Sequence, residues 1–318
     1  MIYDLIVLGG GPAGYLASER AGHAGMSVVC FEKKSVGGVC LNEGCIPTKT
    51  LLYSAKLFDG VAYGEKYGIS ATGLSIDQTK VIERKNKVIR TLVAGVKGTL
   101  KANHVTLVES EAVITGRNSE GYTVIANGET YTGKRLLIAT GSSPSVPPIP
   151  GLNEGIASGF VMTNREALQI TEVPKELVVI GGGVIGLEMA SYYNSVGSKV
   201  TIIEMLDHIA GENDPDLIKL LQKNYEKKGM VFHLNAKVTE VKSDSVLFEK
   251  DGQVQSVSAD KVLLSIGRRA NTQGIGLETI NVLTERGAIV TDNHMKTNQP
   301  EVYAAGDVNG KSMLAHTA

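Results

Sequence analysis

The sequence predicts an α/β protein built from two similar parallel-sheet modules, and three observations support this class. First, residues 3–32 and 175–204 repeat one pattern: an apolar run, a glycine turn, a helical pattern, a second glycine, and an apolar run ending in Glu. Second, Leu5–Leu8 and Leu177–Ile180 are continuously apolar, which suits parallel strands covered on both faces. Third, glycine is abundant and aromatic residues are few, which favours tight turns over an all-β sandwich.

Composition and charge limit the classes of function that the protein could have. The 318 residues suffice for two ordinary domains, and a net charge of −1 gives no electrostatic case for nucleic acid or an anionic membrane. No apolar run approaches the roughly 18 to 20 residues that span a bilayer. The N-terminus opens directly on a strand pattern, so no signal peptide is expected, and three cysteines do not suggest a secreted disulfide framework. We therefore expect a cytoplasmic protein.

The segments between the repeats supply further elements. Residues 75–100 have helical apolar spacing, and a solvated basic face is expected because no aromatic residues interleave with the charges. The basic residues of that face are Lys80, Arg84, Lys85, Lys87, Arg90 and Lys97. Residues 104–138 alternate between polar and apolar residues and contain glycine turn signals, and residues 231–266 show the same pattern. This pattern predicts inserted antiparallel strands.

Two transitions divide the chain into predicted domains. Residues 144–150 are proline-dense, which is typical of an extended linker. A second transition is expected near Gly267–Thr272. The predicted domains are therefore residues 1–149 together with 271–318, and residues 150–270.

Each repeat carries a G-x-G-x-x-G fingerprint directly after its first strand: Gly9, Gly11 and Gly14, then Gly181, Gly183 and Gly186. The first glycine permits a tight turn, the second lets the backbone approach a pyrophosphate, and the third allows close helix–strand packing. The phosphates then meet the free N–H groups and positive end of the following helix. One triad could be only a turn, but two triads in strand–turn–helix–strand context predict two dinucleotide-binding, Rossmann-like modules.

An acidic residue ends the second strand of each repeat. Glu32 and Glu204 each lie 18 residues after the last glycine of their fingerprint. At that position a carboxylate can bind a ribose hydroxyl. The carboxylate of Glu204 would also repel the 2′-phosphate of NADP, so NAD is expected on the second module.

A cysteine pair follows the first module's acid by only 8 and 13 residues, as Cys40 and Cys45. Their five-residue separation lets the side chains meet across a little more than one helical turn. A structural bridge this short gains little entropic stabilisation, and no second Cys/His pair supports a metal site. The pair therefore predicts a redox-active dithiol. Lys49 would project from the same helical face as Cys45 and favour a thiolate, whereas Cys30 is expected to be a buried structural thiol.

Residues 37–49, GGVCLNEGCIPTK, resemble the redox box of the pyridine-nucleotide disulfide oxidoreductase family, most closely that of its dihydrolipoamide dehydrogenases. Three later segments share this resemblance, and the match runs from residue 2 to residue 318: ATGS at 139–142, SIGRRANT at 265–272 and VYAAGD at 302–307. The resemblance implies FAD on the first module and NAD on the second. The implied fold is α/β, with two Rossmann-like FAD/NAD(P)-binding domains and inserted antiparallel β-segments.

The resemblance also implies roles for single residues. Cys45 would be the flavin-proximal thiol, and Cys40 the interchange thiol that meets the substrate. Lys49 would pair with Glu188 beside the flavin and nicotinamide. The other residues expected at the cofactors are Gly141, Gly267, Ala315 and Asp307, the last at the FAD ribityl chain. The implied reaction oxidises the lipoyl group of a 2-oxo acid dehydrogenase or glycine-cleavage complex and reduces NAD⁺.

One feature departs from the family pattern. Relatives continue past a segment like Met313–His316 into a dimer-interface domain, whose His-Glu pair completes the partner's active site. Histidines without the family's histidine–proline context are expected at surface or packing positions: His23, His104, His208, His233 and His294. For a chain ending at Ala318 we expect FAD binding, weak NADH–acceptor activity, little dihydrolipoamide turnover, and a monomer or non-native association in place of the dimer.

Alternatives from other classes stay open. A glutathione- or mercuric-reductase-like enzyme commonly uses NADP and has basic residues near the acidic position of its second fingerprint. Here Glu204 is followed by Met205 and Leu206, which argues against that class. A non-catalytic dinucleotide-binding module needs no dithiol. A peroxide- or oxygen-reducing flavoprotein normally relies on a single reactive cysteine, so the pair argues against that class as well.

Overall fold

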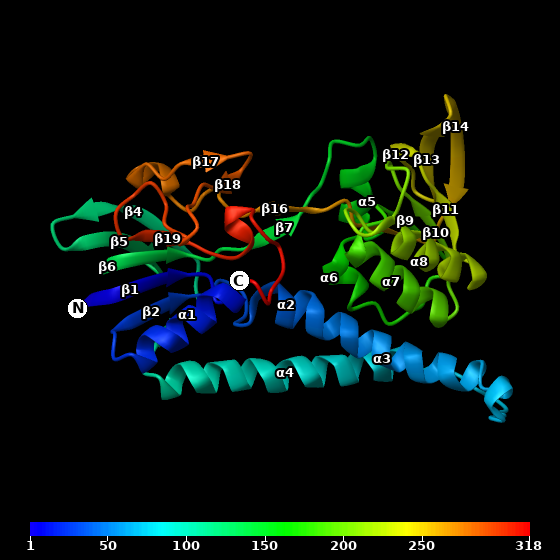
Figure 1. The fold of residues 1–318 in the computed structure, drawn as a ribbon, viewed down its shortest axis with the longest axis horizontal. Helices are drawn as coiled ribbons and strands as arrows, with labels where there is room; N and C mark the ends of the chain where they lie inside the picture. The colour runs from blue at the N-terminus through cyan, green and yellow to red at the C-terminus, as the bar shows by residue number, and fades with distance from the viewer. The chain divides into compact units, whose positions relative to one another are not determined.

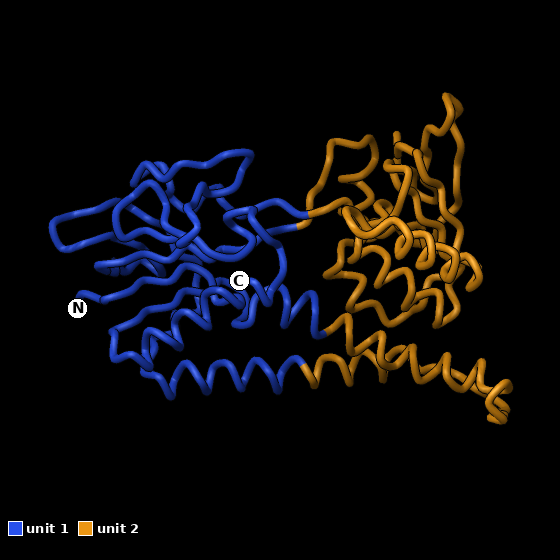
Figure 2. The backbone as a smooth tube through the Cα atoms, in the orientation of Figure 1, with its two compact units in different colours: residues 1–46, 89–143, 268–318 blue, residues 47–88, 144–267 orange.

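The computed structural model describes residues 1–318 and separates into two compact units, which Figure 2 colours separately. Unit 1 comprises residues 1–46, 89–143 and 268–318, and unit 2 comprises residues 47–88 and 144–267. The domain boundaries predicted from the sequence stay a prediction, because compactness alone does not say which residues bind which cofactor.

A seven-stranded sheet forms the centre of unit 1 (Figure 1). Its strands are β1 (Ile2–Leu8), β2 (Val28–Phe31), β3 (Thr106–Val108), β4 (Ala112–Asn118), β5 (Gly121–Ala126), β6 (Glu129–Ile138) and β19 (Val302–Ala304). The order is β3-β2-β1-β6-β5-β4, with β19 also pairing with β6. β1 is buried on both faces, because Leu5 and Val7 enter one apolar cluster while Ile6 and Leu8 enter another.

Helix α1 (Pro12–His23) connects β1 to β2, and the short α2 (Gly38–Glu43) follows β2. Two longer helices, α3 (Cys45–Ala62) and α4 (Gln78–Ala102), each carry the chain from one unit into the other. Smaller elements complete unit 1: the 3₁₀ turns η2 (Leu277–Ile280) and η3 (Asp307–Asn309), and the ribbon β17 (Thr284–Glu285) with β18 (Ala288–Ile289). No helix combines the length and apolar character needed to cross a membrane.

Unit 2 is built on a five-stranded parallel sheet in the order β11-β10-β9-β15-β8. These strands are β8 (Val161–Met162), β9 (Glu176–Ile180), β10 (Lys199–Ile203), β11 (Val231–His233) and β15 (Lys261–Leu264). The antiparallel sheet contains β12 (Lys237–Val241), β13 (Ser245–Lys250) and β14 (Gln253–Ser258). The helices are α5 (Leu152–Ser158), α6 (Asn164–Ala167), α7 (Val184–Ser195) and α8 (Pro215–Lys227).

The predicted fold class is confirmed, with one correction to the inserted strands. The two repeats form β1-α1-β2 and β9-α7-β10, both with parallel pairing. β4 to β6 and β12 to β14 form the expected antiparallel insertions. However, β3 pairs in parallel with β2, β11 with β10, and β15 with β9. β6 belongs to both arrangements, because it pairs antiparallel with β5 and in parallel with β1. Alternation of polarity alone could not distinguish these strands of the nucleotide-binding sheets from the insertions.

The prediction of a solvated basic face on α4 is wrong at one residue, Lys85. Lys80, Arg84, Lys87 and Arg90 are exposed, as expected. Lys85 is fully buried, and its Nζ donates to the carbonyl oxygen of Leu168 at 2.7 Å. The reason lies in unit 2, where Leu168 ends α6 and its carbonyl needs a donor.

Candidate active site and cofactor sites

The first and third glycines of the unit 1 fingerprint are required by the packing of the protein itself. Gly9 has a φ of +104°, and a Cβ there would lie 2.2 Å from the Ala139 carbonyl oxygen. A Cβ on Gly14 would lie 1.7 Å from the carbonyl oxygen of Gly9. Gly11 differs: it has an ordinary φ of −73°, and the nearest atom to its added Cβ is 3.8 Å away, on Gly38. Space therefore remains beside Gly11 at the start of α1.

In the fingerprint of unit 2, too, packing requires the first and third glycines but not the middle one. A Cβ on Gly181, whose φ is +101°, would lie 2.4 Å from the Ser265 carbonyl oxygen. A Cβ on Gly186 would lie 2.5 Å from the carbonyl oxygen of Gly181. Gly183 has a φ of −72° and no atom within 4 Å of an added Cβ. The protein's own packing does not require the middle glycines, so a ligand that approaches the backbone explains them best.

The two acidic residues are held rigidly beside these turns. Glu32 accepts the backbone N–H of Gly10 on Oε2 and that of Lys34 on Oε1, both at 2.8 Å. Glu204 accepts the N–H of Gly182 at 2.5 Å and that of Leu206 at 2.8 Å. A carboxylate has about four lone-pair sites, so each one can still accept a ribose hydroxyl.

Three distant segments meet in unit 1 around residues 140–143. Asn271 donates its side-chain amide to the Thr140 carbonyl at 2.9 Å, and its backbone N–H to Gly141 at 2.9 Å. The Ser142 hydroxyl donates to Asp307 Oδ2 at 2.5 Å. Gly141 has a φ of +69°, which explains glycine at this position of the turn. Of these residues the sequence indicated Gly141 and Asp307; the contacts of Ser142 and Asn271 are visible only in the fold.

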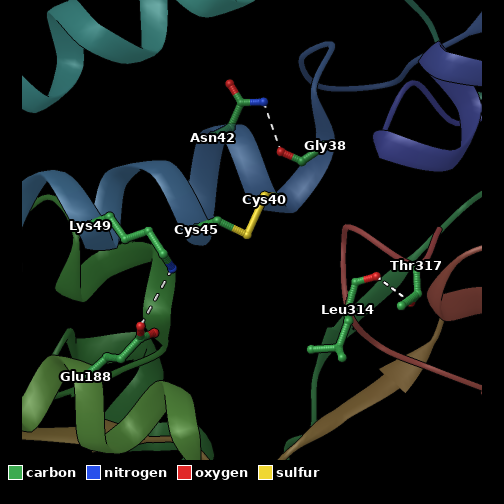
Figure 3. Close-up of a disulfide and its surroundings, with 8 residues drawn as sticks. All are labelled: Gly38, Cys40, Asn42, Cys45, Lys49, Glu188, Leu314 and Thr317. Carbon is green, nitrogen blue, oxygen red and sulfur yellow. Dashed lines mark hydrogen bonds and ion pairs between the residues drawn. A yellow bond between two sulfur atoms is a disulfide. The ribbon is translucent and has the colours of Figure 1, made fainter.

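The cysteine pair forms a disulfide in unit 1, as Figure 3 shows. Cys40 lies in α2 and Cys45 begins α3, with Gly44 between the helices. The predicted contact across a single helical turn is therefore replaced by a contact across a break at Gly44, whose φ and ψ are −146° and −109°. Asn42 donates to the Gly38 carbonyl at 2.9 Å and to Val36 at 3.1 Å, which holds the preceding loop.

A lysine–glutamate ion pair forms in unit 2. Lys49 lies four residues after Cys45 in α3, so its side chain projects from the same helical face. Its Nζ lies 3.8 Å from Oε1 of Glu188 in α7 (Figure 3). Lys49 is 68 % exposed and Glu188 is 32 % exposed, so the pair is open to a ligand or to solvent.

The remaining residues singled out from the sequence have simpler environments. Cys30 is free and fully buried, and burial raises the pKa of its thiol to about 12, which confirms a structural thiol. His233 packs against Phe248, and burial lowers the pKa of its imidazole. Gly267 has a φ of +109°, Ala315 is half-buried, and the neighbouring His316 is exposed.

Two glycine fingerprints and a redox disulfide between cysteines five residues apart define a disulfide oxidoreductase with two dinucleotide sites. The chain belongs to the pyridine nucleotide-disulphide oxidoreductase family, whose model matches residues 3–318. It is 44 % identical over 317 residues to the dihydrolipoyl dehydrogenase of Acholeplasma laidlawii, covering 99 % of this chain and 93 % of that protein. It is 41 % identical to the dihydrolipoyl dehydrogenase of Mycoplasma pneumoniae, covering all of this chain and 69 % of that protein.

A solved structure shares the fold. The HOCl-induced flavoprotein disulfide reductase RclA from Escherichia coli matches with a TM-score of 0.86 at 27 % identity. The match covers 99 % of this chain and 68 % of that one. The family resemblance found in the sequence is thereby confirmed. The chain spans about two thirds of the Mycoplasma pneumoniae and Escherichia coli proteins, but 93 % of the Acholeplasma laidlawii protein.

Proposed function

We propose that this chain acts as a dihydrolipoyl dehydrogenase, which oxidises a dihydrolipoyl dithiol through Cys40 and Cys45 and transfers the electrons by way of FAD to NAD⁺. The observation that carries the proposal is the Cys40–Cys45 disulfide in the same unit as the first glycine fingerprint. Relatives named dihydrolipoyl dehydrogenase support the substrate.

The residues of each unit fit a dinucleotide. The space beside Gly11 and Gly183 admits a pyrophosphate, which the N–H groups at the starts of α1 and α7 can bind. Glu32 and Glu204 accept ribose hydroxyls, and the charge of Glu204 disfavours the extra phosphate of NADP. When bound, FAD accepts the two electrons of the reduced thiols and supplies the hydride that reduces NAD⁺.

The cysteines carry the thiol–disulfide exchange. A dihydrolipoyl thiolate attacks Sγ of Cys40, forming a mixed disulfide and releasing Cys45 as a thiolate. The second lipoyl thiolate then attacks the lipoyl sulfur bonded to Cys40, which closes the lipoyl disulfide and releases Cys40 as a thiolate. The dihydrolipoyl dithiol gives its two electrons to the cysteine pair, and its two protons pass to solvent when its thiols ionise.

Lys49 supports the charged form of the thiols. Its ammonium follows Cys45 by one turn of α3, and a nearby cation favours a thiolate over a thiol. The Glu188 carboxylate orients that ammonium. A lipoyl-bearing multienzyme complex as partner and a cytoplasmic location belong to the same proposal.

Anaerobic mixing of the FAD-loaded protein with dihydrolipoamide tests the proposal. We expect the wild type to develop long-wavelength absorbance from a thiolate against the flavin within a single turnover. Cys40→Ser and Cys45→Ser should each slow this single-turnover reduction of the protein by dihydrolipoamide by roughly a thousandfold. Cys30→Ser is the matched control and should retain the reaction, because Cys30 lies outside the pair. Oxidation at the wild-type rate by either of the other serine variants would contradict the proposal.

Nucleotide preference tests the second site. The proposal expects NADH to reduce the flavin faster than NADPH. Glu204→Gln keeps the size of the side chain but removes its charge, so the preference for NADH should fall about tenfold. Equal rates with both nucleotides in the wild type would refute the assignment of Glu204.

A further inference from the structure

A chain of hydrogen bonds in unit 1 ends on the carboxylate of Asp307. Arg268 donates from Nε to the Ser142 hydroxyl and from Nη2 to the Ser142 carbonyl, both at 2.7 Å. The Ser142 hydroxyl donates to Asp307 Oδ2 at 2.5 Å. Ser142 is only 2 % exposed, so water cannot readily replace these partners. The three residues come from positions 142, 268 and 307, far apart in the sequence.

The chemistry of the three groups fixes the direction of the bonds. A guanidinium can only donate and an ionised carboxylate can only accept, whereas a hydroxyl donates once and accepts on two lone pairs. The proton of the Ser142 hydroxyl must therefore point at Asp307, because Arg268 occupies the accepting side. Hydrogen bonds in which one partner is charged are stronger than neutral ones, and each bond here has one charged partner, so this arrangement holds the carboxylate in one orientation.

We propose that Ser142, anchored by Arg268, is a positioning residue that orients Asp307 to accept a hydroxyl of the flavin ribityl chain. The inference rests on the proposed function, in which unit 1 binds FAD. Asp307 retains further lone-pair sites for a ligand hydroxyl after accepting from Ser142. Gly306, with a φ of +77°, sets the turn that presents Asp307 to the Ser142 hydroxyl.

The neighbouring serine provides a matched control. Ser143 lies on the same strand, β7 (Ser142–Pro144), and its hydroxyl donates to Asn271 Oδ1 at 2.8 Å. Ser143→Ala removes one hydrogen bond from this segment, whereas Ser142→Ala removes two, the one from Arg268 Nε and the one to Asp307. Only the second change removes a donor from Asp307.

Reconstitution of the apoprotein with FAD measures the effect. Ser142→Ala should raise the dissociation constant for FAD at least tenfold, because a hydrogen bond to a charged group is lost. Ser143→Ala should change it less than threefold. With an FAD analogue that lacks the ribityl hydroxyls, Ser142→Ala should raise the dissociation constant less than threefold. In an Asp307→Asn background the same substitution should likewise have little further effect, which a purely structural role of Ser142 would not produce.

Two outcomes separate the inference from the proposed function. Wild-type protein that does not bind FAD overturns both. Wild-type protein that binds FAD, with Ser142→Ala weakening FAD and the deoxy analogue equally, overturns the positioning role alone. If the Ser142→Ala apoprotein unfolds, Arg268→Lys replaces it, because a lysine keeps the charge but cannot bond both oxygens of Ser142 in the fork geometry. That variant should also show a penalty that depends on the ribityl hydroxyls, and its absence overturns the inference.

Discussion

The buried lysine of α4 gives a quantitative prediction about stability and pH. Lys85 is fully buried, and its Nζ donates to the Leu168 carbonyl at 2.7 Å. Burial lowers the pKa of the Lys85 ammonium from 10.5 to about 8. Between these two values the unfolded chain holds a proton on Lys85 that the folded protein does not. The free energy of unfolding must therefore rise with pH through this interval.

The magnitude follows from the two pKa values. Below pH 8 the full penalty for the buried charge applies, about 3 kcal/mol. At pH 9.5 only about 1 kcal/mol of it remains, so the contribution of Lys85 changes by about 2 kcal/mol between pH 7.5 and 9.5. Lys85→Met keeps an unbranched side chain but removes the titrating group, so this pH-dependent part should vanish. The lost bond to Leu168 costs about 1–3 kcal/mol at either pH.

Urea unfolding of both proteins, followed by circular dichroism, measures the effect. Other lysines and tyrosines titrate in this range, but they do so in both proteins, so the difference between wild type and Lys85→Met isolates Lys85. We expect the wild type to gain about 2 kcal/mol relative to the variant between pH 7.5 and 9.5. A difference that stays constant across this range would refute the reasoning, because the buried amine would then hold its proton as firmly as in water.

Further predictions concern the glycines and the thiols. Gly183→Ala should leave the stability of the apoprotein within about 1 kcal/mol, because no atom lies within 4 Å of the new Cβ, yet weaken NADH binding at least tenfold. Gly186→Ala, whose Cβ would meet a carbonyl oxygen at 2.5 Å, should destabilise the protein, and calorimetry with NADH titration distinguishes the two. A thiol reagent should label no cysteine in the native oxidised protein, Cys40 and Cys45 after reduction, and all three after denaturation. Labelling of Cys30 in the native state would contradict its burial.

The local rules of the sequence sufficed for the repeated nucleotide-binding pattern. Apolar runs, fingerprint glycines and terminal acids act over about 30 residues, so β1-α1-β2 and β9-α7-β10 could be predicted without knowledge of distant contacts. The closeness of Cys40 and Cys45 was predictable for the same reason. The break at Gly44 was not, because a helix interruption depends on backbone angles that the spacing of two cysteines does not encode.

Only the tertiary structure decided which residues from distant segments meet. Alternating polarity did not show that β3, β11 and β15 join the parallel sheets, because strand pairing depends on the neighbouring strand and not on the strand itself. The burial of Lys85 depends on a carbonyl 83 residues away. Ser142, Arg268 and Asp307 form one hydrogen-bonded chain across 165 residues of sequence, because β7, β16 (Arg268–Ala270) and η3 meet in unit 1. The sequence alone thus determined the local chemistry, whereas the fold determined which side chain orients each reactive group.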